Sequence, residues 1–451
     1  MAYSAIITRI RNVRPHGNAN KVQLGTCHGN QVVIGLDTQE GDEGIYFACD
    51  GQLSKEFCSA NNLYRDSEQN KDSSKTGMFD PNGRVRAQSF RGQKSDGFWC
   101  PISNLNFIKG FDSKKYEEGY EFETMENVPV CSKYINPATL KIPSENQGKK
   151  TKRAKSSIMF KEHFDTGHLG KSLSSFTYGK NFIVTEKIHG TSSRIGHVLV
   201  EKNHKWYEKI LNKLGISIKD KEWKYLNGTR RVVIEESKGV QFHDPTIRDK
   251  AFSLFNGNLR KGETVFCEIV GFESTGKPIM GSVDIKTMKD KEFEKRWKKP
   301  DGSTTMTYSY GCGPTECQIY VYRITLTNED GQSIDYPWED VKSRCLEIGV
   351  KHVPEIEIFT LDSIYHQLKK GHDSDYVPDD RDVHDAFMKK IDDFVEGPSL
   401  LDDSHIREGV CVRIEGSGFN NSTYKHKGFA FKIMEGIIKD SGVVDTEEAQ
   451  G

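Results

Sequence analysis

The chain has 451 residues, 29% of them charged, and a formal net charge of -1. This length predicts two or three domains, each able to bury a core. Near-neutrality excludes nucleic-acid binding through an overall positive field, so any RNA partner must be held by local basic patches.

The cysteines and the hydropathy pattern indicate in which cellular compartment the protein is expected. The ten cysteines are scattered, with no CxxC pair and no Cys/His ligand spacing, so neither a disulfide framework nor a zinc site is expected. No run approaches the length of a membrane span, and the start at Met1 lacks the charged and apolar segments of a signal peptide. We therefore expect a soluble, cytoplasmic protein with reduced thiols and no membrane partner.

Residues 1–105 carry short β-type runs separated by turns rich in Gly, Asn and Asp. Several short strands that close on themselves predict an OB-like β-barrel, a common platform for nucleic acids. The expected strands are Ser4–Ile10, Val22–Leu24, Val32–Leu36, Gly44–Ala48 and Val85–Ala87.

The last part of this region, Arg84–Trp99, mixes cations with aromatic residues. Such a mixture can hold phosphates and stack a base, but a solvated turn with core aromatics explains it equally well. Residues 106–157 are expected to form a connector. Its run Lys149–Lys155 can meet an RNA backbone or a triphosphate, although such runs are more often linkers.

Residues 158–437 follow an α+β pattern that predicts a two-layer domain built on antiparallel sheets, and residues 438–451 form a tail. The expected strands are Phe182–Glu186, Arg231–Glu235, Thr264–Val270, Gln318–Ile324, Gly409–Ile414 and Gly428–Ile433. The expected helices are Lys205–Leu214, Trp338–Ile348, Leu361–Lys369 and Asp382–Val395.

The first of these strands leads into Thr185–Arg194, where Lys187 lies between an acidic residue and a His-Gly turn. Lysine becomes a nucleophile when desolvation or nearby positive charge lowers its pKa. Gly190 would allow a tight turn close to a phosphate or a ribose. Alone, the tetrapeptide is better explained as a surface turn.

Five downstream residues strengthen the nucleophile hypothesis. Glu268 is a carboxylate inside an otherwise apolar strand, where it needs a partner. Tyr320 and Tyr322 alternate on one expected strand, share a face and can sandwich a purine. Glu408 stands at the mouth of a β-branched strand, and Lys432 lies in the apolar run that we expect to form a strand. Each favours a structural role alone, but their order favours a site.

The series Lys187-Ile188-His189-Gly190, Glu268, Tyr322, Glu408 and Lys432 resembles motifs I, III, IIIa, IV and V of the covalent nucleotidyltransferases. This superfamily contains ATP-dependent RNA ligases, DNA ligases and mRNA capping enzymes. Glu186 before the lysine, and His189 where DNA ligases usually carry Asp, resemble the nick-sealing RNA ligases of the bacteriophage T4 RNA ligase 2 type. The N-terminal β-region resembles the subgroup with an N-terminal OB module, to which the Naegleria and Deinococcus enzymes belong.

The resemblance implies an ATP-dependent RNA ligase in which Lys187 attacks the α-phosphorus of ATP to give lysyl-AMP. It implies sealing of 3′-OH and 5′-phosphate ends, in nicked duplex RNA, through an RNA-adenylate. A Mg²⁺ or Mn²⁺ ion would be held by Glu268 and Glu408. The implied catalytic residues are Lys187, His189, Glu268, Glu408 and Lys432, and the implied nucleotide-binding residues are Glu186, Lys187, Arg230 or Arg231, Glu268, Tyr322 and Lys432.

Two positions depart from the pattern. Motif V of the RNA ligase 2 type reads Lys-x-Lys, whereas Met434 follows Lys432 at that spacing, so the second cation is missing or is supplied from elsewhere. Lys425 and Lys427 are candidates, but we expect the N-terminal side to supply it, through Arg86, Arg91 or the run Lys149–Lys155, because an OB domain that closes over the nucleotide can hold the pyrophosphate. The Naegleria-type subgroup has a metal-binding aspartate where this chain has His189. The histidine is therefore expected to act after lysine adenylylation.

Other functions use the same lysine. DNA ligases and RNA-capping guanylyltransferases share its chemistry but carry an OB domain after motif V, and the segment after Lys432 is too short for one. A non-catalytic RNA-binding repair scaffold is the alternative from another class. The expected partner is nicked duplex RNA or another RNA-containing duplex, bound by a monomer.

Overall fold

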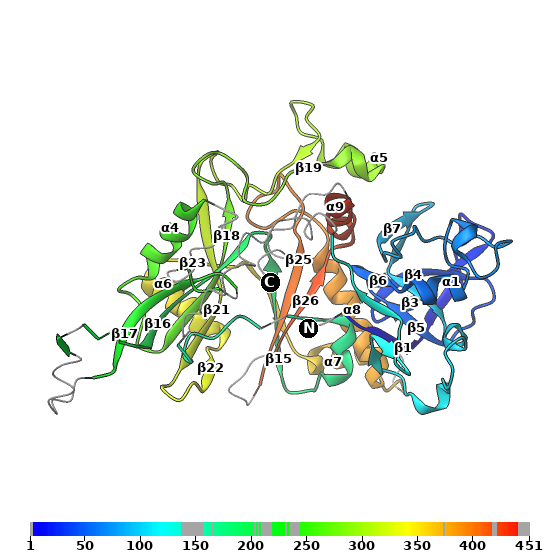
Figure 1. Cartoon of the computed structure of the whole chain (residues 1–451), viewed down its shortest axis with the longest axis horizontal. Coiled ribbons are helices and arrows are strands. Elements are labelled where there is room, and N and C mark those ends of the chain that lie inside the picture. Colours follow the sequence, from blue (N-terminus) through cyan, green and yellow to red (C-terminus); the bar gives the residue numbers. More distant parts are fainter. Residues whose placement is uncertain are drawn as a thin grey trace.

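The computed structural model describes residues 3–136, 157–164, 166–202, 204–205, 207–208, 219–230, 232–234, 244–372, 375–416 and 422–440. The run Lys149–Lys155 and the residue Arg231 lie outside the described residues, as do most of the expected helix Lys205–Leu214 and the two ends of the expected strand Arg231–Glu235. In the described middle of that strand, Val233 forms an isolated bridge with Gly228. Figure 1 shows the N-terminal module at one end of an elongated molecule and two large sheets in the rest.

The N-terminal module is built on short antiparallel strands, as expected. A four-stranded sheet has the order β10-β1-β5-β9, and a three-stranded sheet has the order β2-β3-β4. Among the described residues, no sheet of this module closes into a barrel. Its elements are β1 Ala5–Arg9, β2 Arg11–Pro15, β3 Val22–Cys27, β4 Asn30–Gly35, β5 Glu43–Phe47, β6 Gly51–Leu53, α1 Lys55–Ala60, η1 Ser67–Gln69, β7 Ala87–Phe90, β8 Gln93–Asp96, β9 Phe98–Pro101 and η2 Ile102–Leu105.

The first part of the expected connector pairs with this module. β10 lies antiparallel to β1, and β13 lies antiparallel to β6. Phe122, Met125 and Val130 are buried in the same core as Phe47 and Phe57, so this segment has a packing role. Its elements are η3 Ser113–Lys115, β10 Glu121–Phe122, β11 Thr124–Met125, β12 Val128–Pro129 and β13 Cys131–Lys133.

The larger part of the chain forms two sheets that stand side by side in Figure 1. One has the order β14-β26-β25-β15-β24, and the other has the order β17-β16-β18-β21-β22 with β23 also paired to β21. Among the described strands of these two sheets, only the short pairs β14–β26 and β21–β23 are parallel. The strands are β14 Gly167–His168, β15 Asn181–Lys187, β16 Thr191–Glu201, β17 Lys221–Gly228, β18 Glu263–Gly271, β21 Cys317–Thr327, β22 Ser333–Asp335, β23 Lys351–His352, β24 Glu355–Phe359, β25 Gly409–Glu415 and β26 Ser422–Lys427.

Helices cover these sheets and complete their cores. α4 (Pro245–Phe255) and α6 (Trp338–Ile348) bury apolar side chains against the sheet of β18 and β21, whereas α7 (Leu361–Lys370) and α8 (Asp380–Val395) pack on the sheet of β15 and β25. The bounds of α6 are those expected. α8 begins two residues earlier than expected, because the Asp379 side chain caps it by accepting from the Asp382 N–H. The remaining elements are η4 Gly170–Ser175, β19 Val283–Asp284, η6 Ile285–Met288, α5 Lys291–Trp297, β20 Thr305–Met306 and α9 Phe429–Asp440.

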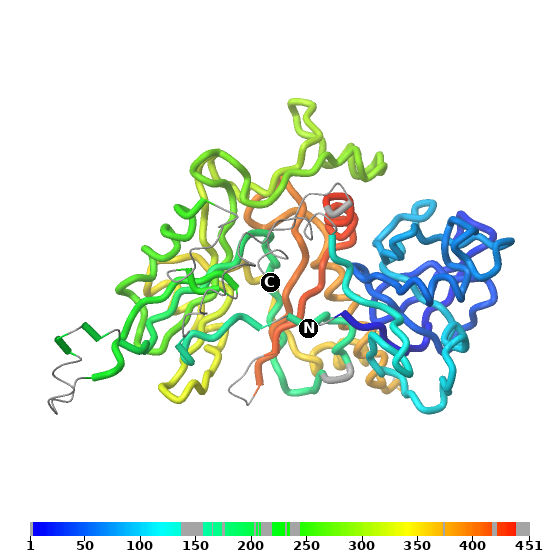
Figure 2. The backbone as a smooth tube through the Cα atoms, viewed as in Figure 1, coloured from blue at the N-terminus to red at the C-terminus, as the bar shows by residue number. Residues whose placement is uncertain are grey.

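The expected strand Gly428–Ile433 is wrong, because this segment starts the helix α9. Phe431 and Met434 are buried at a spacing of three residues, which places both on one face of a helix. The strand that pairs with β25 on this side is instead β26, whose residues are mostly polar and which lies between β25 and β14. In Figure 2 this last helix returns toward the N-terminal module.

The ten cysteines are all free thiols. In the part of the chain that the structure describes, no helix combines the length and the apolar character needed to cross a membrane.

Candidate active site

A cavity of about 170 Å³ lies between the two large sheets. Its walls come from β15, β25 and β26 on one side and from β18 and β21 on the other. The expected site residues Glu186, Lys187, Arg230, Glu268, Tyr322 and Glu408 all line this cavity, although they lie more than two hundred residues apart along the chain.

Lys187 ends β15, where it pairs with Gly409 of β25. The turn that follows packs tightly against β18: a Cβ added at Gly190 would lie 2.4 Å from the carbonyl oxygen of Ile269. Glycine is therefore required by the close approach of two backbones. This approach brings the end of β15, with Lys187, next to the strand that carries Glu268.

Glu408 is the charged centre of the cavity, and its side chain is 3% exposed. Its Oε1 lies 2.8 Å from Nζ of Lys187 and 3.3 Å from Nζ of Lys427, and its Oε2 lies 3.5 Å from Nδ1 of His189. Burial alone would raise the pKa of Glu408, but the charges of Lys187 and Lys427 hold it well below its ordinary value. The carboxylate is thus ionised and shared between two lysines.

Lys425 and Lys427 lie two positions apart on β26, so their side chains point to the same face of the strand, and both line the cavity. Lys427 also contacts Glu435 of α9 at 3.0 Å. Burial, together with the charges of Lys427 and Lys187, lowers the pKa of Lys425 to about 8. Burial would lower the pKa of Lys427 too, but Glu435 and Glu408 hold it well above its ordinary value.

Lys432 does not occupy the position that we expected for motif V. It belongs to α9, it is absent from the lining of the cavity, and its Nζ lies 2.5 Å from Oδ2 of Asp96 in β8. Met434 is buried in the core. The two cations at Lys-x-Lys spacing are Lys425 and Lys427, so the second cation is not missing from the chain.

Glu268 lies opposite Ser192 in the pairing of β18 with β16, and Ser192 donates its Oγ–H to Oε2 of Glu268 at 3.2 Å. Glu186 is 1% exposed and accepts the N–H of Leu400 at 2.8 Å. Burial raises the pKa of Glu186. Its carboxylate therefore anchors the loop at Leu400 on the wall of the cavity.

Of the two tyrosines expected to form a sandwich, only Tyr322 lines the cavity, with His163 edge-on at 5.2 Å between ring centroids. Tyr320 is buried in the core. The pairing of β21 with β18 shifts here: Val321 pairs with Cys267 and Arg323 with Phe266, so Tyr322 is an extra, bulged residue. A bulge redirects a side chain, which breaks the simple alternation that the sequence indicated.

Arg230 lines the cavity, as do two arginines that the sequence patterns did not single out. Nε of Arg323 lies 2.6 Å from Asp335, and Nε of Arg413 lies 2.8 Å from Glu415. Arg323 follows Tyr322 on β21, and Arg413 lies on β25, the strand that begins directly after Glu408. This closeness in sequence to expected site residues was the signal that could have identified the two arginines.

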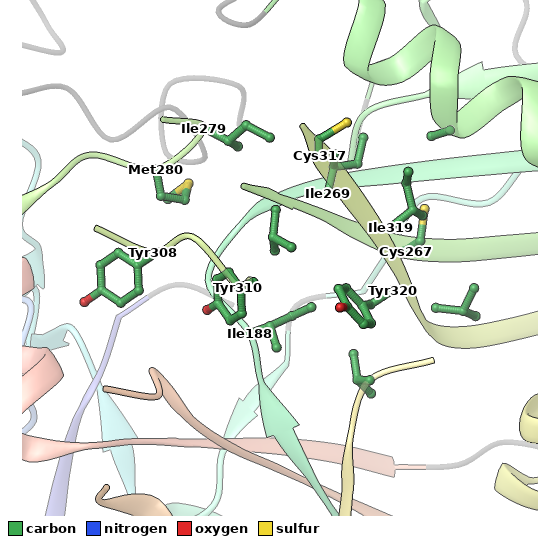
Figure 3. Close-up of a cluster of buried hydrophobic side chains, with 14 of the residues drawn as sticks. Ile188, Cys267, Ile269, Ile279, Met280, Tyr308, Tyr310, Cys317, Ile319 and Tyr320 are labelled. Carbon is green, nitrogen blue, oxygen red and sulfur yellow. The ribbon is translucent and has the colours of Figure 1, made fainter. Parts of the chain in front are cut away.

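His189 lies next to the cavity rather than in its lining. Its ring stands edge-on to Tyr308 at 4.8 Å and to Phe431 at 4.9 Å, and its backbone N–H donates to the hydroxyl of Tyr310 at 2.5 Å. Figure 3 shows Tyr308 and Tyr310 beside Ile188, among buried side chains that support this turn. Aromatic packing therefore fixes the backbone two residues after Lys187.

The cluster Arg84–Trp99 contacts the rest of the protein away from the cavity. Arg84 donates to the carbonyl of Gly436 at 3.3 Å, and Lys94 lies 3.6 Å from Glu396. Trp99 is buried. No residue of this cluster lines the cavity, so its cations and aromatics serve the interface with α9 and the module core.

The family model for RNA ligases matches residues 180–433. The chain belongs to the RNA ligase family. The match contains the cavity residues from Glu186 to Lys427, including Lys425 on β26.

The fold of this RNA ligase family member is similar to those of several solved structures. A variant of Naegleria gruberi RNA ligase without ligand is 16% identical, with a TM-score of 0.54, and the match covers 96% of this chain and 98% of that one. A variant of the same enzyme with AMP and Mn is 15% identical, with a TM-score of 0.52 and a coverage of 95% and 97%. Another with ATP and Mn is 15% identical, with a TM-score of 0.51 and a coverage of 96% and 98%. Comparison with curated protein sequences gave no match.

Proposed function

We propose that the chain is an ATP-dependent RNA ligase that joins a 3′-OH end to a 5′-phosphate end, at nicks in duplex RNA. The observation that carries this proposal is the position of Lys187 in the cavity. Its amine lies among Lys425, Lys427, Glu408 and Tyr322, a set that offers a nucleophile, two phosphate-binding cations, a carboxylate and an aromatic face.

The cavity suits a nucleotide. Lys425, Lys427 and Arg230 supply positive charge for phosphates, and the Tyr322 ring offers a face on which adenine can stack. The fold relative from Naegleria gruberi was solved with ATP and with AMP, each together with Mn. These three observations support ATP as the co-substrate.

The reaction has three displacements at phosphorus. In the first, Nζ of Lys187 forms a P–N bond to the α-phosphorus of ATP and loses a proton, while the bond to the β-phosphate oxygen breaks and pyrophosphate leaves. In the second, an RNA 5′-phosphate oxygen attacks the same phosphorus and the P–N bond breaks, which gives the RNA-adenylate. In the third, the RNA 3′-OH attacks the 5′-phosphorus and AMP leaves.

The residues of the cavity have different roles in these reaction steps. Lys187 cannot attack while it is an ammonium paired with Glu408, so its proton must be lost before the P–N bond forms. Lys427, which already contacts Glu408, can balance the carboxylate once Lys187 is neutral. Lys425 and Lys427 stabilise the charge that develops on the α-phosphate. Tyr322 orients the base.

Glu268 and Glu408 would hold a divalent ion, which supplies charge neutralisation at the phosphate. Within the described ranges no group of three metal-ligating side chains occurs, so phosphate oxygens and water would complete the shell of such an ion. The two carboxylates at one cavity fit an ion that arrives with a nucleotide. Glu408 would exchange a lysine contact for it.

The roles of His189 and of the N-terminal module belong to the same proposal. His189 contacts Glu408 from outside the cavity lining, so it can orient this carboxylate, and its proposed role is in the steps after the lysine is adenylylated. The antiparallel β-module, together with the similarity to the Naegleria enzyme over nearly the whole chain, supports an OB-type module of the kind that this subgroup carries.

The deciding experiment follows labelled AMP. Wild-type protein incubated with α-labelled ATP and Mn²⁺ should retain label after denaturation, and Lys187→Ala should retain none. Lys389→Ala, which removes an exposed lysine of α8, is the matched control and should label like the wild type. Absence of label from the wild type would favour the non-catalytic repair scaffold and reject the proposal.

The nucleic-acid substrate needs a second assay. Nicked RNA–RNA, RNA–DNA and DNA–DNA duplexes and single strands should be compared, with sealing fastest when the nick is in RNA. Preference for a DNA–DNA nick would identify a DNA ligase, and labelling by GTP in place of ATP would identify a capping guanylyltransferase.

A further inference from the structure

A basic arm, residues 283–306, leaves the sheet between β18 and β21. It comprises β19, η6, α5 and β20, and the pairing of β19 with β20 closes its base. In Figure 1 the arm projects from the top of the molecule, beside α9. None of its residues lines the cavity.

Seven cations lie on the basic arm. Six of them are exposed and Lys299 is half-buried, and none forms an ion pair with any residue that the structure describes. The arm also has five acidic residues, so its formal net charge is 7 - 5 = +2, and three of these acids have fixed positions as helix or turn caps. Asp284, Asp290 and Asp301 accept backbone N–H groups of the arm. The cations are Lys286, Lys289, Lys291, Lys295, Arg296, Lys298 and Lys299.

The arm presents these charges from a fixed base. Phe293 and Trp297 of α5 pack on each other, with ring centroids 6.1 Å apart, and against the core of the larger sheet. η6 packs against α9. Cations held on a packed helix lose less freedom on binding a phosphate backbone than cations on a linker do.

The base of the arm touches the turn that carries the nucleophile. β20 ends at Met306, and two residues later the Tyr308 ring meets His189 at 4.8 Å. The Tyr310 hydroxyl accepts the N–H of His189 at 2.5 Å. The base of the arm is therefore joined to the turn that directly follows Lys187.

We propose that the basic arm binds the phosphate backbone of the duplex RNA whose ends are joined at Lys187. This inference rests on the proposed function, since the partner of the arm is the substrate of that site. On the proposed function, duplex RNA is the polyanion held beside the cavity, and a set of lysines without ion-pair partners recognises its backbone without reading its sequence. The competing explanation is a solvated basic surface without a partner.

The test compares two triple variants that lose equal charge. The arm variant is Lys289→Gln/Lys291→Gln/Lys295→Gln. The control variant is Lys369→Gln/Lys370→Gln/Lys389→Gln, which removes exposed lysines from α7 and α8. Binding of each protein to fluorescent nicked duplex RNA is measured without ATP over a range of salt concentrations.

The arm variant should bind RNA about tenfold or more weakly, and the slope of log affinity against log salt should be shallower by about 2–3, roughly one for each phosphate that the arm no longer neutralises. The control variant should match the wild type. Labelling by α-labelled ATP needs no RNA, so its retention in the arm variant would show that the variant folds. In sealing assays, KM for RNA should rise while kcat at saturating RNA stays near the wild-type value.

Three results would overturn the inference: wild-type affinity and salt slope in the arm variant, an equal loss in both triple variants, or no binding of duplex RNA by the wild type. The first two leave AMP labelling, and hence the proposed function, intact. A wild-type protein that binds RNA through the arm but takes no label would reject the proposed function and retain the arm as an RNA-binding surface.

Discussion

Nζ of Lys187 lies 2.8 Å from Oε1 of Glu408, a carboxylate that is almost entirely buried. In this pair the lysine is held as an ammonium, which is not a nucleophile. The pair nevertheless holds the Lys187 side chain in the cavity. Once Lys187 has formed its adduct with AMP, the Glu408 carboxylate loses this partner. Formation of the lysine adduct therefore has to separate Lys187 from Glu408.

Glu408→Gln should lower the rate of AMP labelling by about a hundredfold or more, the usual effect of removing one preorganised charge from such a site. The amide keeps the size of the side chain but cannot neutralise Lys187, Lys427 or a metal ion. The rate is measured with α-labelled ATP, and Glu329→Gln, at an exposed turn, is the control. Labelling of Glu408→Gln within a few-fold of the wild type would contradict this assignment.

Lys425 should make stability depend on pH in the alkaline range. Its pKa is about 8 in the folded protein and about 10.4 in the unfolded chain. Between these values the unfolded chain binds more protons, so stability rises with pH. Below pH 8 both states are charged and the destabilising effect is complete; it disappears as the pH rises toward about 10.4.

The variant Lys425→Met should therefore be more stable than the wild type at pH 7, by about 2 kcal/mol once the water that still reaches this side chain is allowed for. The difference in Tm between the two proteins should shrink from pH 7 to pH 10. AMP labelling should fall in the variant, because a phosphate-binding cation is removed. If the stability advantage of Lys425→Met stays constant over this pH range, burial of the lysine charge is not the cause of that advantage.

Much of the larger domain could be predicted from the sequence, because its elements follow simple periods. β18 is buried along its whole length and reads as an apolar run interrupted by Glu268. α6 and α7 follow the helical period, and their expected bounds agree with the structure within one residue. The convergence of Lys187, Glu268, Tyr322 and Glu408 on one cavity was also predicted, from the order of motifs rather than from any local signal.

The motif V region was misread, for a physical reason. The apolar side chains of Phe429 and Phe431 alternate like those of a strand, but burial of Phe431 and Met434 follows the helical period. The true strand, β26, faces the cavity rather than a core, so Lys425 and Lys427 replace the apolar residues that mark a strand in sequence. β26 therefore lacks the apolar alternation on which the prediction of a strand depends.

The bulge at Tyr322 was equally hidden, because a single extra residue changes register without changing composition. It leads to a test of the aromatic wall. Tyr322→Leu should raise KM for ATP at least fivefold, since stacking of a base on an aromatic ring contributes about 1–3 kcal/mol. Tyr322→Phe should stay near the wild type.

Tyr320→Leu is not a suitable control, because Tyr320 is buried in the core. Tyr320→Phe keeps the ring and removes only the hydroxyl that donates to Gln318 at 2.7 Å. Its KM for ATP should match that of the wild type. Equal effects at Tyr320 and Tyr322 would contradict the assignment of the base to the cavity side of the bulge.

The pair Asp96–Lys432 links the N-terminal module to the cavity through α9. One turn of α9 carries Lys432 toward Asp96, Phe431 against His189 and Glu435 against Lys427. Asp96→Asn leaves the largely buried Lys432 without its anion and should lower stability by about 1–3 kcal/mol. We also expect AMP labelling to slow by roughly tenfold, since α9 holds two groups that surround Glu408.

A double-mutant cycle separates this link from two independent losses. Asp96→Asn, Lys432→Met and the double variant are compared by Tm and by the rate of AMP labelling. If the pair connects the module to the cavity, the double variant should be little worse than either single one, with a coupling energy above about 1 kcal/mol. Lys94→Gln, which breaks the exposed contact with Glu396 in the same interface, should change stability by less than about 1 kcal/mol. Additive losses in the cycle, or normal labelling in all three variants, would mean that α9 keeps Lys427 in place without help from the N-terminal module.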